Sequence, residues 1–204
     1  IASPEKSVDP SIAKGGYISQ DNSWLLLVQF SPEQATSIIA QCTNLTFLVI
    51  RDHNLEELSL DHARELKKLE ILENGKPIRF WGNKFLASLE HLCIRTPQLF
   101  DKLDFRNATQ LRELTIETRT KSSVKIEGLD WCGSLTVLEL QNISLDVINL
   151  DKLRNIKILH LHGMDTEIHI SNKHDYLTKL WLYTCTVESL AFLLQLVALE
   201  VLVV

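Results

Sequence analysis

The sequence lacks long hydrophobic stretches, since no run approaches the 18 consecutive apolar residues that a membrane-spanning helix needs. We therefore predict no membrane insertion within this chain. Basic residues do not dominate either: 21 Lys and Arg stand against 26 Asp and Glu, which gives a formal net charge of −5. Nucleic-acid binding depends on clustered Lys and Arg, so we predict no nucleic-acid partner. Apolar residues at 45% and charged residues at 23% exclude wholesale disorder of the 204-residue chain.

Motifs of enzyme chemistry are missing as well. The seven glycines are scattered and form no phosphate-binding loop. The sequence contains no Gly-x-Ser-x-Gly, His-Glu-x-x-His or Cys-x-x-Cys motif. Cys93 lies near His91 and suggests a thiol–imidazole pair, but a nucleophile also needs an oriented base and an oxyanion site. We predict that the protein is not an enzyme, has no catalytic residues and uses no cofactor.

What the sequence does contain is a repeat. The template aliphatic-x-x-aliphatic-x-aliphatic occurs nine times, at steps of 20 to 24 residues between successive first positions. A single match means nothing in a Leu-rich chain, but nine at near-constant spacing indicate a repeat architecture. Positions one, four and six are Leu25/Val28/Phe30, Leu45/Leu48/Ile50, Leu66/Leu69/Ile71, Leu89/Leu92/Ile94, Leu111/Leu114/Ile116, Leu135/Leu138/Leu140, Ile156/Leu159/Leu161, Leu177/Leu180/Leu182 and Leu199/Leu202/Val204.

This pattern resembles the leucine-rich repeat family, and the resemblance covers about residues 25–204. The family consensus is Leu-x-x-Leu-x-Leu-x-x-Asn/Cys-x-Leu. At its ninth position only Asn74 and Cys185 match, so the repeats are irregular. The buried asparagine ladder of the family is therefore expected to be mostly absent.

The resemblance implies an α/β fold, a curved leucine-rich repeat solenoid with a parallel β-sheet on the concave face and loops and short helices on the convex face. Because side chains alternate along a strand, positions four and six point into the core, and positions three, five and seven face outward. We expect about nine repeats over residues 25–204. Ser31-Pro32-Glu33-Gln34 predicts a helix start, with the helix running to Gln41. No long helix is expected elsewhere.

The two ends of the chain depart from the repeat. Residues 1–24 are polar, and two alternatives stand for them: a cap strand around Tyr17-Ile18, or a flexible segment. Residue 1 is Ile rather than Met, and the sequence stops on the apolar stretch Leu199 to Val204. We expect a fragment of a longer protein whose repeats continue beyond residue 204. Because open edge strands tend to pair with another chain, a homodimer through the C-terminal edge is one option for this fragment.

The concave face is predicted to be a docking surface for a protein. Its centre is polar and acidic and its C-terminal part is rich in aromatic residues and histidine, while Trp, Tyr and Arg are the usual anchors of interfaces. At its N-terminal end Leu27, Phe47 and Val49 are expected to lie under a cap. The predicted ligand-binding residues are Arg51, His91, Arg95, Glu113, Glu117, Glu139, His160, His162, Trp181 and Tyr183.

His160 and His162 carry two further hypotheses. They are two residues apart on one predicted strand, and Glu139 on the neighbouring unit could serve as a third metal ligand. A closed ligand set is lacking, however, so we predict no metal site. If both histidines lie at an interface, binding would vary between about pH 5 and 7.

Cysteines and glycosylation sequons point to different compartments. Cys42 and Cys132 occupy equivalent positions four units apart, and Cys93 and Cys185, at positions five and nine, also lie four units apart. Four units are about 20 Å by strand spacing, which is too far for a disulfide. Four free thiols favour a reducing compartment. Against this stand three sequons whose asparagines map to turns; they are Asn44, Asn107 and Asn142.

The function that we predict is protein binding. The first hypothesis is an extracellular or cell-surface receptor, or a secreted recognition protein, that would resemble Toll-like receptors or insect immune repeat proteins. The alternative is a cytoplasmic leucine-rich repeat adaptor or scaffold, such as the substrate-binding repeats of an F-box protein or the sensor repeats of an immune receptor. Occupancy of the three sequons separates these two hypotheses.

Overall fold

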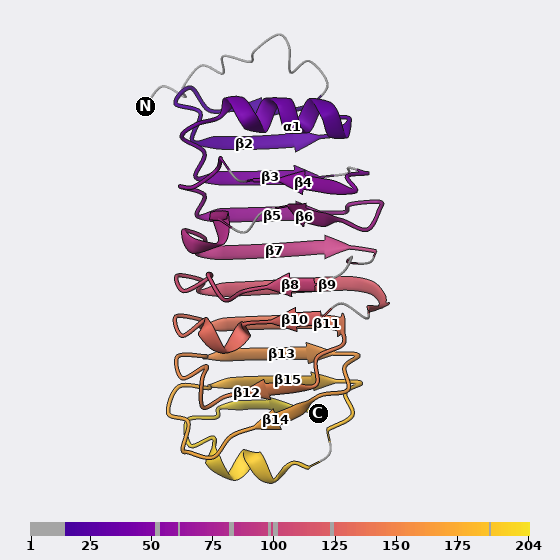
Figure 1. Ribbon diagram of the computed structural model, residues 1–204. Helices are drawn as coiled ribbons and strands as arrows, with labels where there is room; N and C mark the ends of the chain where they lie inside the picture. The colour runs from indigo at the N-terminus through magenta and orange to yellow at the C-terminus, as the bar shows by residue number, and fades with distance from the viewer. Residues whose placement is uncertain are drawn as a thin grey trace, which may run out of the picture.

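A computed structural model describes residues 15–51, 54–60, 62–81, 84–97, 99, 102–122, 125–187 and 189–204. The chain is α/β, and most of its strands form one long and mostly parallel sheet in a solenoid-like arrangement (Figure 1). Successive units follow one another along the molecule, from the indigo N-terminal end to the yellow C-terminal end. Residues 1–14 of the predicted N-terminal segment lie outside the described residues.

The main sheet has ten strands. Its first strand is antiparallel to the second, and all later pairs are parallel. Of the two alternatives for residues 1–24, the structure thus has a cap strand at Tyr17–Ile18. In spatial order the strands are β1 (Tyr17–Ile18), β2 (Trp24–Val28), β3 (Phe47–Arg51), β5 (Lys68–Leu72), β7 (His91–Thr96), β9 (Glu113–Ser122), β11 (Val137–Ile143), β13 (Ile158–His162), β15 (Lys179–Tyr183) and β16 (Val201–Val203).

Two inward columns of aliphatic side chains run the length of the sheet. One column joins the fourth positions of successive units, so that Leu48 pairs with Leu69 and Leu138 pairs with Leu159. The other joins the sixth positions, as in the pair Ile71 and Ile94. The predicted register is confirmed for the second and all later units, as far as the fourth position of the last unit. The first column consists of Leu25, Leu48, Leu69, Leu92, Leu114, Leu138, Leu159, Leu180 and Leu202, all buried except the last.

The register predicted for the first unit is wrong by three residues. Leu25 pairs with Leu48 and therefore takes position four, not position one. Leu27 is fully buried, so it does not belong to the outward face as predicted. Position one of this unit is Asn22, a residue at φ 56° that follows the cap strand. The aliphatic template could not recognise a polar first position, and the Leu25-Leu26-Leu27 run allowed a match in another frame.

Hydrogen bonds at the start of each strand repeat with the same period. The Thr46 carbonyl accepts the amides of Lys67 and Lys68, at 2.8 and 3.0 Å. The equivalent carbonyl near the end of the chain, that of Thr178, accepts two amides of the last unit at 2.9 and 3.0 Å. The hydroxyl groups of Thr46 and Thr178 donate back to the carbonyl of the unit before. These bonds satisfy the backbone where each unit turns into its strand.

At the other end of the strands, polar side chains satisfy the backbone. Asn74 is buried, accepts the Leu55 amide at 3.1 Å and donates to the Leu55 carbonyl at 2.8 Å. In later units the Thr96 hydroxyl donates to the backbone carbonyl of Lys76, and the Asn142 side chain donates to the Thr118 carbonyl at 2.7 Å. Threonine thus takes over part of the role that asparagine has at position 74.

The helices agree closely with those predicted from the sequence. The structure has α1 at Pro32–Gln41, with Ser31 as N-cap and a capping box between Ser31 and Gln34, which confirms the predicted helix. The remaining helices of the described residues are short 3₁₀ segments, namely η2 (Lys84–Ala87), η3 (Leu129–Trp131) and η4 (Ala191–Gln195). Among the described residues, none of the helices has the length and hydropathy to cross a membrane.

A second layer of short strands faces the main sheet, where only loops and short helices were predicted. It consists of three parallel pairs (Figure 1). Leu58, Ile126 and Ile148 at the centres of these strands are buried in the same core as the leucine columns. Strands of three residues give almost no alternation signal, so the sequence pattern missed them. The pairs are β4 (Glu57–Ser59) with β6 (Arg79–Trp81), β8 (Lys102–Asp104) with β10 (Lys125–Glu127), and β12 (Val147–Asn149) with β14 (Glu167–His169).

Gly128, which precedes η3, offers a test of this second layer. It has φ 73°, and a Cβ at this position would lie 2.5 Å from the Arg106 backbone nitrogen. We expect Gly128→Ala to lower the free energy of unfolding by about 2 kcal/mol. The alanine would have to keep a left-handed backbone conformation, and its Cβ would clash with the backbone of Arg106. A Cβ at Gly133 meets nothing within 4 Å, so Gly133→Ala should change stability by less than about 0.5 kcal/mol. Urea unfolding of both variants checks this, and equal effects would contradict the packing described.

Candidate functional site

The outward face of the main sheet is formed by the third, fifth and seventh positions of the units, between the buried columns. Its side chains are half-buried or exposed, apart from Val49, which is 8% exposed. Every predicted ligand-binding residue lies on this face, although their role in binding stays a prediction. In sheet order they are Arg51 on β3, His91 and Arg95 on β7, Glu113 and Glu117 on β9, Glu139 on β11, His160 and His162 on β13, and Trp181 and Tyr183 on β15.

The centre of the outward face carries ion pairs between neighbouring strands. His91 Nδ1 lies 3.0 Å from a Glu113 carboxylate oxygen, and Arg95 Nε lies 3.1 Å from Glu117. The Arg51 side chain pairs instead with Glu73, beyond the end of β5, at 3.4 Å. Such exposed pairs contribute little to stability, but they fix the orientation of side chains on the face.

The C-terminal part of the outward face holds an aromatic cluster formed by His160, His162, Trp181 and Tyr183. The His160 ring centroid lies 5.8 Å from that of Trp181 and 5.5 Å from that of Tyr183. The His162 ring lies 6.2 Å from Tyr183 in an edge-on arrangement. Because β13 and β15 pair in register, residues 21 positions apart in sequence become direct neighbours. We call this group the aromatic cluster.

A small pocket opens where the charged centre meets the aromatic cluster. Its volume is about 160 Å³. Seven of its nine lining residues have polar side chains, and two of them are joined by a hydrogen bond that Thr115 Oγ1 donates to Glu139 at 3.3 Å. The lining residues are Arg95, Thr115, Ile116, Glu117, Glu139, Leu140, Gln141, His160 and His162. Sequence reasoning placed all of these residues except the inward Ile116 and Leu140 on one face, but it could not show that they line a hollow.

The N-terminal end of the outward face is aromatic too. The Tyr17 ring lies 4.8 Å from Trp24, and the Trp24 ring lies 5.9 Å from Phe47. Lys68 Nζ lies 4.7 Å from the centre of the Phe47 ring. The outward Trp24 was missed because the first unit was placed in the wrong frame, whereas the cap strand was one of the two alternatives for this segment.

Neither nucleophilic nor metal chemistry is favoured by the geometry of this face. His91 pairs with Glu113 rather than with Cys93. Burial is the largest cause of the raised pKa of the Cys93 thiol; Arg95 lowers this pKa, and Glu70, Glu139 and Glu117 raise it. A raised pKa lowers the fraction of reactive thiolate. Within the part of the chain that the structure describes, no group of three His, Cys, Asp or Glu side chains could hold a metal ion.

The four cysteines are free thiols. Burial raises the pKa of each of them, and that of Cys132 to about 12. Cys42 and Cys132 are fully buried next to the repeat core, as small apolar side chains would be.

The three sequon asparagines occupy different environments. Asn44 and Asn107 are exposed in turns, as predicted. Asn142 is not in a turn, because it belongs to β11, where it has φ 56° at a shift in the strand register. Its Nδ2 donates to the Thr118 carbonyl, so a glycan on this nitrogen would compete with a hydrogen bond of the fold.

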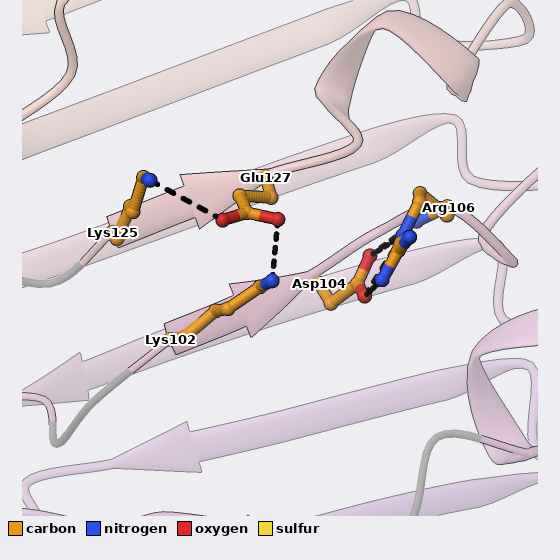
Figure 2. A network of polar contacts seen from close by, with 5 residues as sticks. All are labelled: Lys102, Asp104, Arg106, Lys125 and Glu127. Atoms are coloured by element: carbon orange, nitrogen blue, oxygen red, sulfur yellow. Dashed lines mark hydrogen bonds and ion pairs between the residues drawn. The ribbon is translucent and has the colours of Figure 1, made fainter.

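A second charged cluster lies on the opposite layer, on β8 and β10 (Figure 2). Asp104 accepts hydrogen bonds from Arg106 Nε, and Lys102 pairs with Glu127 across the two strands. Lys125 Nζ lies 3.5 Å from Glu127. The Arg106 hydrogen bond lowers the pKa of Asp104 from 3.8 to about 2. These contacts join two neighbouring units and give the cluster a structural role.

A scan against protein-family models gives no match for this sequence, and a search of curated proteins finds no relative.

The Asp104 ion pair predicts a pH dependence of stability. A lowered pKa in the folded state stabilises the fold above about pH 3.8, and this contribution is lost as the pH falls through about 2. We expect Asp104→Asn to lower the free energy of unfolding by about 0.5–1 kcal/mol at pH 7, since the pair is partly exposed. The difference from the parent protein should shrink towards pH 2. Denaturant titrations across this range check it, with exposed Asp175→Asn as the control variant; a difference that does not change with pH would refute the assignment.

Proposed function

We propose that this chain is a leucine-rich repeat module that recognises a protein through its outward face, as part of a receptor or secreted recognition protein. Support for the family comes from the eight template matches from the second unit onward, together with the in-register columns of buried leucines. A solenoid of this kind offers an extended surface on which many units contribute side chains to one partner.

One observation carries the binding proposal: the aromatic cluster stands on the open face of a sheet. Tyr183 is 42% exposed, and the histidines and Trp181 beside it are only half-buried. Large aromatic side chains are costly to leave in water, and they are typical anchors of protein interfaces. The ion pairs of the charged centre flank the cluster, as a polar rim flanks the apolar core of an interface.

The alternative is a cytoplasmic adaptor or scaffold with the same binding face. It is favoured by the four free thiols, since small secreted domains commonly carry disulfides. The exposed sequons Asn44 and Asn107 favour the extracellular version. Both versions bind a protein and neither is an enzyme, in keeping with the raised pKa of Cys93.

We also propose a homodimer through the C-terminal edge of the main sheet. Among the residues that the structure describes, β16 pairs with β15 alone, and Leu202 and Val204 are 43% and 72% exposed. Unpaired strand edges with apolar side chains favour association with a second strand. The contact in such a dimer would not involve the aromatic cluster on β13 and β15.

Replacing the aromatic anchors tests the binding face. We expect the Trp181→Ala, Tyr183→Ala double variant to lose captured protein partners, with a dissociation constant raised at least about thirtyfold, because each anchor of an interface contributes on the order of 2 kcal/mol. The matched control is Trp131→Ala, Tyr176→Ala, which removes residues 64% and 53% exposed that lie off this face. Quantitative affinity capture compares them. Equal loss in both variants, or none in either, would refute the proposed face.

Glycan occupancy tests the compartment. In a chain passed through a secretory pathway, we expect glycans on Asn44 and Asn107, whose side chains are exposed, and little on Asn142, whose amide is engaged. Peptide mass spectrometry with and without glycosidase measures occupancy at each site. Unmodified Asn44 and Asn107 in the natural protein would favour the adaptor over the receptor.

A further inference from the structure

Glu139 differs from the other glutamates of the outward face. Glu70 pairs with Lys68 at 2.8 Å, Glu113 with His91 and Glu117 with Arg95. Glu139 forms no ion pair with any residue that the structure describes, and its contact is the Thr115 hydroxyl at 3.3 Å. A carboxylate that is only half-buried and has one weak donor retains acceptor capacity for a ligand.

The pocket around Glu139 is anionic at neutral pH. Arg95 and Glu117 cancel each other as a pair, so with neutral histidines the remaining charge is the −1 of Glu139.

Size and lining also restrict the occupant. A volume of about 160 Å³ is small beside the roughly 300–1,000 Å³ of pockets for drug-sized ligands. It suits the end group of one side chain. The rings of His160 and His162 form one wall, and Trp181 and Tyr183 lie behind them.

We infer that this pocket binds the cationic end of an Arg or Lys side chain presented by a protein partner, with Glu139 as its counter-ion and the aromatic cluster packed against its stem. The inference rests on the proposed function and specifies the chemistry of the partner at that face. A protein is the source, because the pocket is one hollow on an open sheet whose flanking residues can contact the rest of a polypeptide.

Protonation of the two histidines makes the affinity of this contact depend on pH. The charged and titratable groups facing His160 and His162 are Glu139 on β11, Lys179 and Tyr183 on β15, and the Arg95–Glu117 pair across the pocket. Histidine side chains change charge between about pH 5 and 8. Two imidazolium groups would change the charge of the pocket from −1 to +1, so binding of a cation weakens as the pH falls.

A pair of small probes tests the inference directly. N-acetyl-arginine methylamide carries the cation, and N-acetyl-citrulline methylamide has nearly the same shape without charge. NMR titration of the intact chain follows the Trp181 indole and the side chains of His160 and His162. We expect saturable shifts with the arginine probe at pH 7.5, about tenfold weaker binding at pH 5.5, and about tenfold weaker binding of citrulline at pH 7.5.

Two matched variants locate the counter-ion. Glu139→Gln removes the charge and keeps the size and the Thr115 contact, so it should reduce arginine binding about tenfold. Glu70→Gln lies on the same face, but outside the pocket and outside the predicted ligand-binding residues, and should leave binding unchanged. Thermal unfolding shows that both variants remain folded.

The outcomes separate this inference from the proposed function. If arginine and citrulline bind alike, if neither binds, or if Glu139→Gln has no effect, the inference is overturned; the proposed function still stands when the Trp181→Ala, Tyr183→Ala variant loses its protein partner. If that double variant keeps its partners, the proposed function fails, and the inference of a protein cation fails with it, even where the probe binds.

Discussion

Burial of aliphatic side chains between stacked parallel strands is the interaction on which the structure depends. A single unit exposes the leucines at positions four and six, and it can bury them only against the next unit. Leu48, Leu92 and Leu138 are therefore stable inside the fold only when their neighbours are in register. The periodic hydrogen bonds at both strand ends, from Thr46 to Thr178 and at Asn74, depend on the same spacing.

The outward face is a consequence of this constraint. Because side chains alternate, fixing the inward leucines also fixes which side chains face outward and which of them meet across strands. Arg95 and His162 are far apart in sequence, yet they line one pocket. A shift of one unit by a single residue would bury Glu139 or Trp181 and expose leucines, so the outward face is as strongly specified as the core.

The sequence predicted the repeat, the helix at Pro32–Gln41 and the outward position of Trp181 because each has a strong local signal: spacing, a capping box or alternation. It misplaced the first unit because Asn22 breaks the aliphatic template. It missed the short strands of the second layer, such as Val147–Asn149, because three residues carry no period. Whether Glu139 has an ion-pair partner depends on contacts between side chains of different units, and no pattern along the sequence predicts those contacts.

The most direct test of the account is a methyl NOE spectrum of the chain with leucine methyl groups labelled. Neighbouring strands lie about 4.8 Å apart, so methyl groups of adjacent units in a column are in contact. The account predicts connected cross-peaks in the order Leu48, Leu69, Leu92, Leu114, Leu138, Leu159 and Leu180. Leucines of this series that contact one another in a different order, or show no contact with their predicted neighbours, would contradict the stacked register and with it the face that we propose for binding.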